Sequence, residues 1–258
     1  MSNASSKHVW PTGLKTGKRW LLAIGNQNYQ NYPDLAASID DAEAVAEVLA
    51  SNYGFQTKVL RDASKLDLLL ALDEIRRTAG ADDDVIVYFA GHGELSGASG
   101  SWVPSDGALN QANTWLPNKV VSDMLATMSA RNVLVLADSC YAGTLTAAAV
   151  PRASASFGGG DWAAWAKASG AGRSRMALTS GGVRPVFDAA AGGSSLFSAA
   201  LLKVLRRNRG VLEAQTLYQE SSDLLALTSA SEQLTDLPTF APIAFAGHER
   251  GELLLAEK

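Results

Sequence analysis

The chain has 258 residues, of which 47% are hydrophobic, and a formal net charge of −4 at pH 7. This length and composition fit one large globular domain, and a single cysteine excludes an internal disulfide. The mild negative charge argues against a protein that binds nucleic acid or an anionic membrane surface. No segment reaches the ~18 consecutive apolar residues of a membrane span. Residues 1–20 lack the apolar core of a secretory signal, so we expect a cytoplasmic protein.

The first segment in chain order, 1–18, is polar, and we expect a flexible leader there, ahead of a domain that covers 19–258. Residues 19–29 are an apolar run closed by glycine and asparagine, which predicts a buried strand that leads into a loop. Residues 39–55 have apolar side chains at helical spacing. Two aspartates lie near the start of that segment, where the helix dipole favours acidic residues, so it predicts a helix.

The same alternation of apolar runs and amphipathic segments continues to the end of the chain. It predicts further strands at 56–62, 84–93, 131–140, 174–182 and 239–247, and further helices at 63–80, 117–130, 194–208 and 211–230. Apolar strands that alternate with amphipathic helices indicate an α/β domain with a mainly parallel sheet.

Two stretches carry no such periodicity. A glycine-rich loop follows the strand at 84–93. Residues 144–174 are rich in Ala, Gly and Ser and are too long for an ordinary connection. We expect a mobile surface loop there, inside one domain.

Two of the predicted strands end in residues that carry chemistry. His92 follows the strand at 84–93 between two glycines, and Cys140 closes the strand at 131–140. Sites in open parallel sheets form at the carboxyl ends of the strands, so neighbouring strands would place both side chains in one crevice. A cysteine attacks as the thiolate, and a nearby imidazole either stabilises that thiolate or removes the proton.

Each residue alone has a simpler explanation. A single cysteine is most often an inert buried hydrophobe, and a histidine after a strand is often a hydrogen-bonded loop residue. Together, at equivalent strand ends and among small residues, they favour a catalytic pair. The backbone N–H groups of Gly93 and Cys140 are candidates to stabilise a developing oxyanion.

The segments "YFAGHGE" at 88–94 and "DSCYAG" at 138–143 resemble the caspase and metacaspase superfamily of cysteine peptidases, most of all its bacterial members. The resemblance covers nearly all of 19–250. The separation of the two residues, 140 − 92 = 48, is close to the ~50 residues found in caspases. The resemblance implies a caspase-hemoglobinase-like fold with a six-stranded sheet sandwiched by helices. It also implies endopeptidase activity, with Cys140 as nucleophile and His92 as base.

The motif around the cysteine departs from both branches of the superfamily. The Gln-Ala-Cys-x-Gly pattern of animal caspases is absent, and Asp-Ser-Cys is the metacaspase form. That form usually continues as His-Ser-Gly, whereas this chain has Tyr141, Ala142 and Gly143. The change follows the nucleophile, and we expect the cleft to tolerate it.

Metacaspase-like relatives take a basic residue before the cut with acidic side chains, one of which lies two positions before the cysteine. That position is Asp138 here, and the second acid matches Asp41, with Asp40 as the alternative. We add Ser38 and Ser180 as further substrate-binding candidates. The resemblance therefore implies cleavage after Arg or Lys. Helix capping explains Asp40 or Asp41 equally well, whereas a carboxylate at a buried strand end needs a partner.

Calcium activates many metacaspases through clustered aspartates, and the matching region of this chain lacks the acidic pair. We therefore expect no calcium requirement, no other metal and no cofactor. The acidic run at 82–84 is not the spaced pattern of a calcium loop. One cysteine and three scattered histidines make no zinc site.

Basic residues in and just after the loop at 144–174 are candidates for self-processing by an enzyme that cuts after Arg or Lys. They are Arg152, Lys167, Arg173 and Arg175. A plain surface loop is the alternative.

We expect a monomer rather than a dimer, a protein or peptide substrate, and in addition a regulatory partner as a candidate trigger. The first alternative to an active peptidase is a catalytically silent interaction module, or a zymogen that needs a partner. Inactive relatives usually lose the cysteine or the histidine, and this chain keeps both. A thiol hydrolase or acyltransferase that acts on small molecules is a further alternative.

Overall fold

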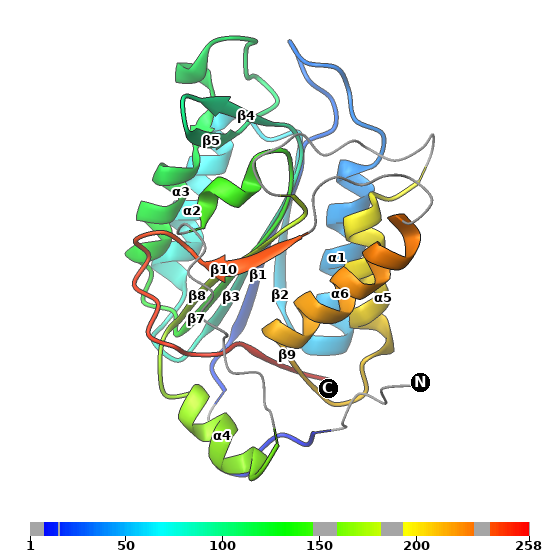
Figure 1. Ribbon diagram of the computed structural model, residues 1–258. Coiled ribbons are helices and arrows are strands. Elements are labelled where there is room, and N and C mark those ends of the chain that lie inside the picture. The colour runs from blue at the N-terminus through cyan, green and yellow to red at the C-terminus, as the bar shows by residue number, and fades with distance from the viewer. Residues whose placement is uncertain (1–7, 15, 147–158, 182–192, 230–237, 258) are drawn as a thin grey trace.

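The computed structural model describes residues 8–14, 16–146, 159–181, 193–229 and 238–257. At its centre is a sheet of six strands, β1 (Arg19–Gly25), β2 (Gln56–Arg61), β3 (Asp84–Ala90), β7 (Asn132–Asp138), β8 (Ser174–Thr179) and β10 (Thr239–Pro242). The strand order is β10-β8-β7-β3-β1-β2 (Figure 1). All neighbours are parallel except β10, which runs antiparallel to β8. The predicted mainly parallel six-stranded sheet is confirmed.

Helices cover both faces of this sheet. Figure 1 shows α1 (Ser38–Tyr53), α5 (Leu196–Arg207) and α6 (Ala214–Ser229) on one side, and α2 (Lys65–Thr78) with α3 (Asn118–Ala126) on the other. The predicted layers, with helices on both faces of the sheet, are therefore confirmed. In the part of the chain that the structure describes, no helix has the length and apolar character to cross a bilayer.

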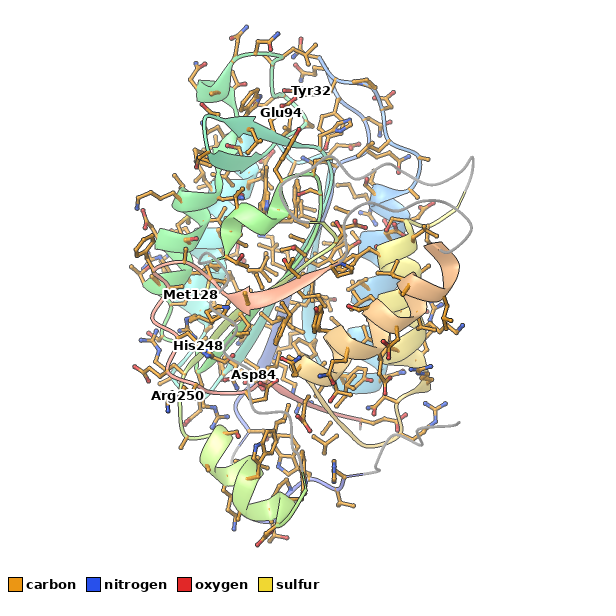
Figure 2. All side chains as sticks on the ribbon, viewed as in Figure 1. Tyr32, Asp84, Glu94, Met128, His248 and Arg250 are labelled. Atoms are coloured by element: carbon orange, nitrogen blue, oxygen red, sulfur yellow. The ribbon has the colours of Figure 1, made fainter. Side chains whose placement is uncertain are left out.

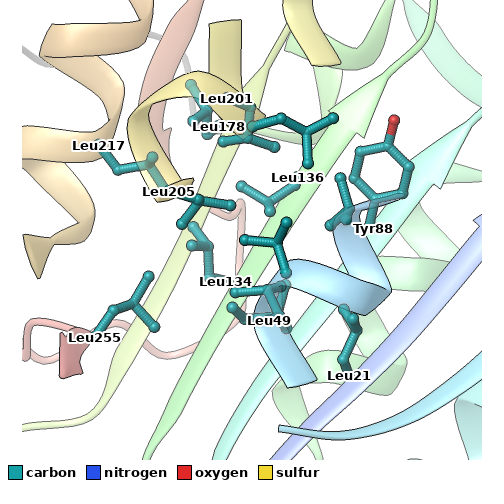
Figure 3. Packing of buried hydrophobic residues seen from close by; sticks show 14 of the residues in the cluster. Leu21, Leu49, Tyr88, Leu134, Leu136, Leu178, Leu201, Leu205, Leu217 and Leu255 are labelled. Carbon is teal, nitrogen blue, oxygen red and sulfur yellow. The ribbon is translucent and has the colours of Figure 1, made fainter. Parts of the chain in front are cut away.

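The alternation of side chains along each strand divides the buried apolar residues into two cores. Along β7, for example, Leu134 and Leu136 face α1 and α5, while Val133 and Val135 face α2 and α3. Figure 3 shows the first core, in which leucines of β1, β7 and β8 interdigitate with leucines of α1, α5 and α6. The face of the sheet toward which each strand residue points also limits the directions available to the residues just beyond the strand.

The glycine-rich stretch after β3 is not a loop, contrary to the prediction. It forms a small antiparallel sheet of β4 (Gly93–Ser96), β5 (Ser99–Trp102) and β6 (Leu116–Pro117). Gly97 opens the turn between β4 and β5 with a φ of 63°, which glycine adopts without a steric cost. The glycines in this stretch therefore mark a hairpin.

The C-terminal elements also differ from the prediction. The segment predicted as one helix at 211–230 begins with a short strand, β9 (Val211–Glu213), before α6 starts. This strand pairs with β11 (Leu254–Ala256), which the sequence pattern did not indicate. Both strands are three residues long, too short to show a periodicity.

The stretch at 144–174 is more ordered than predicted. A short 3-10 helix covers Ala142–Leu145, and α4 covers Trp162–Ser169; residues 147–158 lie outside the described part. Figure 1 shows α4 at the end of the sheet opposite β4 and β5. Trp162 donates its indole N–H to the carbonyl of Val9 (2.8 Å), and His8 stacks on it. Residues 8–14 of the expected flexible leader are thus held against α4.

The position of Arg175 does not fit its prediction as a self-cleavage site. The side chain is fully buried in β8, and its guanidinium donates to the carbonyls of Met128, Ala130, Arg131 and Ser174 at 2.6–3.0 Å. A peptidase needs an accessible, extended chain, whereas Arg175 lies in the interior of a paired strand. We therefore withdraw Arg175 as a self-cleavage site and assign it to the support of the segment before β7.

We expect Arg175→Met to lower the free energy of unfolding by about 3 kcal/mol or more, because buried carbonyls lose charge-assisted donors. Urea denaturation at pH 7 measures the change. Arg206→Met is the matched control, since Arg206 is exposed in the last turn of α5 and should stay within about 0.5 kcal/mol of the native chain. Equal losses in both variants would contradict the assignment.

Candidate active site

The register between β3 and β7 brings the two sequence motifs together. Ala90, the last residue of β3, lies opposite Asp138, the last residue of β7. His92 and Cys140 each follow two residues later, so both leave the sheet at the same row of its carboxyl edge. The N–H of Gly91 donates to the carbonyl of Asp138 (3.2 Å) and continues the pairing past the strand ends.

Gly93 is the point at which the two motifs touch. A Cβ atom at this position would overlap the carbonyl oxygen of Cys140 and come within 3.3 Å of its backbone nitrogen. Only a residue without a side chain lets the backbone after His92 pack directly on the backbone of Cys140. The glycine is therefore required by the close approach of the chains.

The loop after β1 orients the imidazole of His92. Its Nε2 lies 2.8 Å from the carbonyl oxygen of Pro33, and its backbone N–H donates to the hydroxyl of Tyr29 (2.9 Å). The rings of Tyr29 and Tyr32 pack on the imidazole, with centroids 4.8 and 5.5 Å away. Because a carbonyl oxygen only accepts, Nε2 carries the hydrogen and Nδ1 of the neutral ring keeps the lone pair.

Cys140 lies in a tight turn between β7 and the 3-10 helix. The cysteine is half-buried. The next residue, Tyr141, has a φ of 59°, in the left-handed region that non-glycine residues seldom adopt. Gly100 of β5 packs against the carbonyl of Tyr141, where a Cβ atom would come within 2.8 Å. This turn carries a backbone conformation of the kind that functional sites often hold.

The β4–β5 pairing directs the backbone N–H of Gly93. Val103 donates its N–H to the carbonyl of His92 (2.9 Å), which makes His92 and Val103 a hydrogen-bonded position. The next pair along the hairpin, Gly93 and Trp102, is therefore a non-hydrogen-bonded position. The N–H of Gly93 therefore points away from β5.

Asp138 faces the layer that contains α1 and α5. It continues the alternation of Leu134 and Leu136, whose side chains lie in that core. Asp41 of α1, 2% exposed, lies in the same layer and is close enough to act on the charge of Asp138. The structure thus brings the two predicted acids together, from residues 97 positions apart (138 − 41 = 97).

Ser195, at the start of α5, bridges the two acids. Its backbone N–H donates to Oδ2 of Asp41 (2.9 Å), and its hydroxyl donates to Oδ2 of Asp138. The hydroxyl of Ser198 also reaches Oδ2 of Asp138 (3.1 Å). We call these four residues the acid pocket.

Burial dominates the electrostatics of the acid pocket. Desolvation is the main cause that raises the pKa of Asp138 to about 6, and the nearby charge of Asp41 acts in the same direction. The serine hydroxyls act in the opposite direction, because a hydrogen bond to the carboxylate favours its charged form. Asp138 is thus ionised at neutral pH and neutral in mild acid.

The remaining substrate-binding candidates are Ser180, Ser38 and Asp40, of which two are buried and one is exposed. Ser180, just after β8, is buried, and its N–H donates to the carbonyl of Ala137 (2.9 Å), next to Asp138. Ser38 is buried at the start of α1. Asp40 is exposed, so of the two neighbouring acids only Asp41 joins the acid pocket, and we remove Asp40 from the candidates.

The sequence interpretation missed Pro33, Tyr29, Ser195 and Ser198. Pro33 acts through a backbone carbonyl, which no residue type signals. The two serines did carry a signal: a serine just before an apolar helical pattern is a typical N-cap, and Ser195 accepts the N–H of Ser198 (2.9 Å) in that role. What the sequence could not show is that the cap faces two acids.

Aromatic residues surround this end of the sheet. Trp102 and Trp115 are both buried, and Trp102 stacks on Phe89 with ring centroids 4.5 Å apart. They are core residues and not walls of an open cleft. Figure 2 shows Tyr32 and Glu94 at the same end, whereas Asp84, Met128 and His248 lie at the other end of the sheet. Across the described ranges, no group of three or more His, Cys, Asp or Glu side chains is placed to hold a metal ion.

Comparisons with known proteins agree with this fold. A family model described as a caspase domain matches residues 18–242. The crystal structure of protein GSU0716 from Geobacter sulfurreducens is similar in fold, with a TM-score of 0.59 and 17% sequence identity. The similarity covers 91% of this chain and 98% of that one. No curated protein matches the sequence.

We expect Gly93→Ala to separate the two motifs, because the added methyl group overlaps the carbonyl of Cys140. Overpacking of this kind costs about 1–3 kcal/mol, and alkylation of Cys140 by a peptide-based probe should slow at least roughly tenfold. Thermal unfolding and mass spectrometry of the labelled protein measure the two effects. Gly80→Ala is the control, since its Cβ atom would lie 3.8 Å from the nearest atom, Oδ2 of Asp83. Unchanged labelling of the Gly93 variant would contradict the contact.

Proposed function

Since this chain belongs to the C14 family of peptidases with a caspase domain, we propose that it is a cysteine endopeptidase that cuts proteins after arginine or lysine. Cys140 is the nucleophile and His92 the base in this proposal. The observation that carries it is the register of β3 and β7, which places both residues in one row beyond the sheet. The acid pocket beside them supports the preference for a basic residue.

The proposed reaction begins with a proton transfer. Nδ1 of His92 accepts the thiol proton of Cys140, and the thiolate sulfur attacks the carbonyl carbon of the scissile peptide bond. The hydrogen bond from Nε2 to Pro33 supports this assignment, because it leaves Nδ1 as the basic nitrogen. The same bond stabilises the imidazolium that forms.

The negative charge then moves to the carbonyl oxygen of the substrate. The backbone N–H groups of Gly93 and Cys140 are the proposed donors to this oxyanion, and the outward N–H of Gly93 supports that role. The carbon–nitrogen bond breaks as the imidazolium returns its proton to the leaving amine. Water, activated by His92, then attacks the thioester and releases the acid product and the free thiol.

The acid pocket gives the proposed specificity. The buried carboxyl group of Asp41 and the half-buried one of Asp138 attract a guanidinium or ammonium group, and they repel the acidic residue that animal caspases accept. Asp41 comes from the start of α1 and Asp138 from the end of β7, so a long basic side chain can reach both at the carboxyl end of the sheet. Calcium independence remains part of the proposal, tested below with a chelator.

Self-processing between β7 and β8 also remains a proposal. Arg152 lies outside the described residues. Lys167 is exposed in α4 and Arg173 donates to the carbonyl of Met128 (3.0 Å), both just before the start of β8. Cys140 follows the end of β7, whereas the parallel strand β8 starts beside the beginning of β7. A strand of seven residues separates these two ends by roughly 23 Å. Cleavage at Lys167 or Arg173 therefore requires a second molecule, whereas Arg152 is closer to Cys140 along the chain.

We expect the native chain to release fluorophore from peptides ending in Arg or Lys, and not from those ending in Asp, with or without a calcium chelator. Cys140→Ala should abolish this turnover, and His92→Gln should lower kcat/KM by roughly 10² to 10⁴. Turnover by Cys140→Ala, or cleavage after Asp, would contradict the proposal. If the native chain turns over no peptide, alkylation of Cys140 by an Arg-containing probe separates a trigger-dependent zymogen, which is labelled, from a silent interaction module, which is not.

The pH dependence of KM provides a test of the acid pocket. As pH falls through about 6, Asp138 gains a proton and the pocket loses charge, so KM for an Arg peptide should rise roughly tenfold between pH 7 and pH 5. As pH rises above 7, KM should stay constant. Asp138→Asn should raise KM at pH 7 and remove this dependence, whereas Asp40→Asn, an exposed neighbour of the pocket, should retain it. A native KM that does not change between pH 5 and 7 would exclude Asp138 from substrate binding.

A further inference from the structure

The first turn of α5 is the feature of the acid pocket that the proposed reaction does not explain. We propose that Ser195, assisted by Ser198, is a positioning residue for specificity: its hydroxyl keeps the Asp138 carboxylate charged and turned toward the substrate's basic side chain. This inference rests on the proposed function, because it assigns how the same site maintains its preference for Arg or Lys.

The donor and the acceptor in each hydrogen bond of Ser195 can be assigned in only one way. Its hydroxyl oxygen accepts the N–H of Ser198 (2.9 Å), which caps α5. The hydroxyl hydrogen is then left for Asp138. Its own backbone N–H goes to Asp41 (2.9 Å). One residue thus satisfies a helix end and ties both acids to it.

Ser198 and Tyr88 extend this network. The hydroxyl of Ser198 donates to Asp138 (3.1 Å), so the hydroxyl of Tyr88, 2.6 Å from that of Ser198, must donate to Ser198. Tyr88 is fully buried in β3. One chain of hydrogen bonds therefore runs from the hydroxyl of Tyr88 through that of Ser198 to Asp138. A second hydrogen bond reaches Asp138 from the hydroxyl of Ser195. Both end on Oδ2 of Asp138, and neither uses Oδ1.

This arrangement offsets a specific electrostatic cost. Two carboxyl groups that are buried close together tend to share one proton, which would leave the pocket half-charged. The N-terminus of α5, a helix of 12 residues, adds the positive end of its dipole to the two hydroxyl donors. The titratable groups that act on Asp138 are Asp41 from α1 and, through Ser198, Tyr88 from β3. The other groups that act on Asp138 are the hydroxyls of Ser180, just after β8, and of Ser195 and Ser198 at the start of α5, and these do not titrate.

The role of Ser195 as the N-cap of α5 shows whether it supports the pocket or blocks it. If Ser195 blocked the pocket, it would have to leave when a substrate arrives, and α5 would lose its N-cap. As a positioning residue, it stays in place while the cation approaches Oδ1 of Asp138, which Ser195 and Ser198 leave unused. The structure therefore assigns Ser195 to the support of the pocket.

The decisive measurement is the titration of the Asp138 carboxyl carbon by NMR, with Asp138→Asn used to assign the signal. In Ser195→Ala we expect the midpoint to rise by about one pH unit, because the carboxylate loses a charge-assisted donor. Ser195→Thr, which keeps a hydroxyl group, should restore it. Ser64→Ala is the matched control: Ser64 caps α2 on the other face of the sheet, so α2 loses its cap and the Asp138 midpoint stays.

Kinetics supply the second readout. For an Arg peptide at pH 6, Ser195→Ala should raise KM about fivefold with little change in kcat; the difference should shrink to about twofold at pH 7 and vanish at pH 8.5, where Asp138 is ionised in both proteins. An unchanged Asp138 midpoint in Ser195→Ala overturns the inference, and so does a lower KM, which would mean that Ser195 blocks the pocket. If the native chain cleaves no basic peptide and the Arg-containing probe does not label Cys140, the proposed function fails, while the titration still decides the role of Ser195.

Discussion

The parallel register between β3 and β7 is the constraint on which the rest of the site depends. With Ala90 opposite Asp138, residues an equal distance beyond each strand end must emerge in the same row. Gly93 then allows the two backbones to touch, since it has no side chain to hold them apart. A shift of the register by one residue would reverse which face of the sheet each side chain meets. The chemistry of the site is thus determined by hydrogen bonds made deep in the sheet.

The same alternation determines where the acid pocket lies relative to the proposed catalytic pair. Asp138 keeps the face of Leu134 and Leu136, and therefore points to α1 and α5. Cys140 lies past the end of the strand, in a turn with a left-handed residue after it. The carboxyl group of Asp138 lies two residues before Cys140 in the sequence. It stays in the layer of α1 and α5, where the donors of α5 act on its charge.

Much of this architecture could be predicted from the sequence. The strands that are buried on both faces and the amphipathic helices between them have long, strong patterns, and the motifs around His92 and Cys140 lie where those patterns stop. The short elements could not be predicted in the same way, because β9 and β11 contain too few residues for a period. The hairpin after β3 was missed because its glycines were interpreted only as loop residues.

The individual roles of charged residues were harder to predict. Asp40 and Asp41 are equivalent by type and position, and only the rotation of α1 buries one and exposes the other. Arg175 looks like any basic residue near a loop until its partners, four backbone carbonyls, are known. Such roles depend on groups far away in the chain, and a local pattern does not contain them.

The path of the connection from β7 to β8 determines what would remain assembled if the backbone were cut there. It leaves the sheet beside Cys140 and returns at the opposite end, where Trp162 and residues 8–14 hold α4. β8 is paired with β7 over six residues and with β10 over four. A break of the backbone within 147–158 would thus leave a complex of two fragments that share one sheet. Asp41 and Asp138 would belong to one fragment and Ser195 to the other, so an intact pocket would report that the fragments are still assembled.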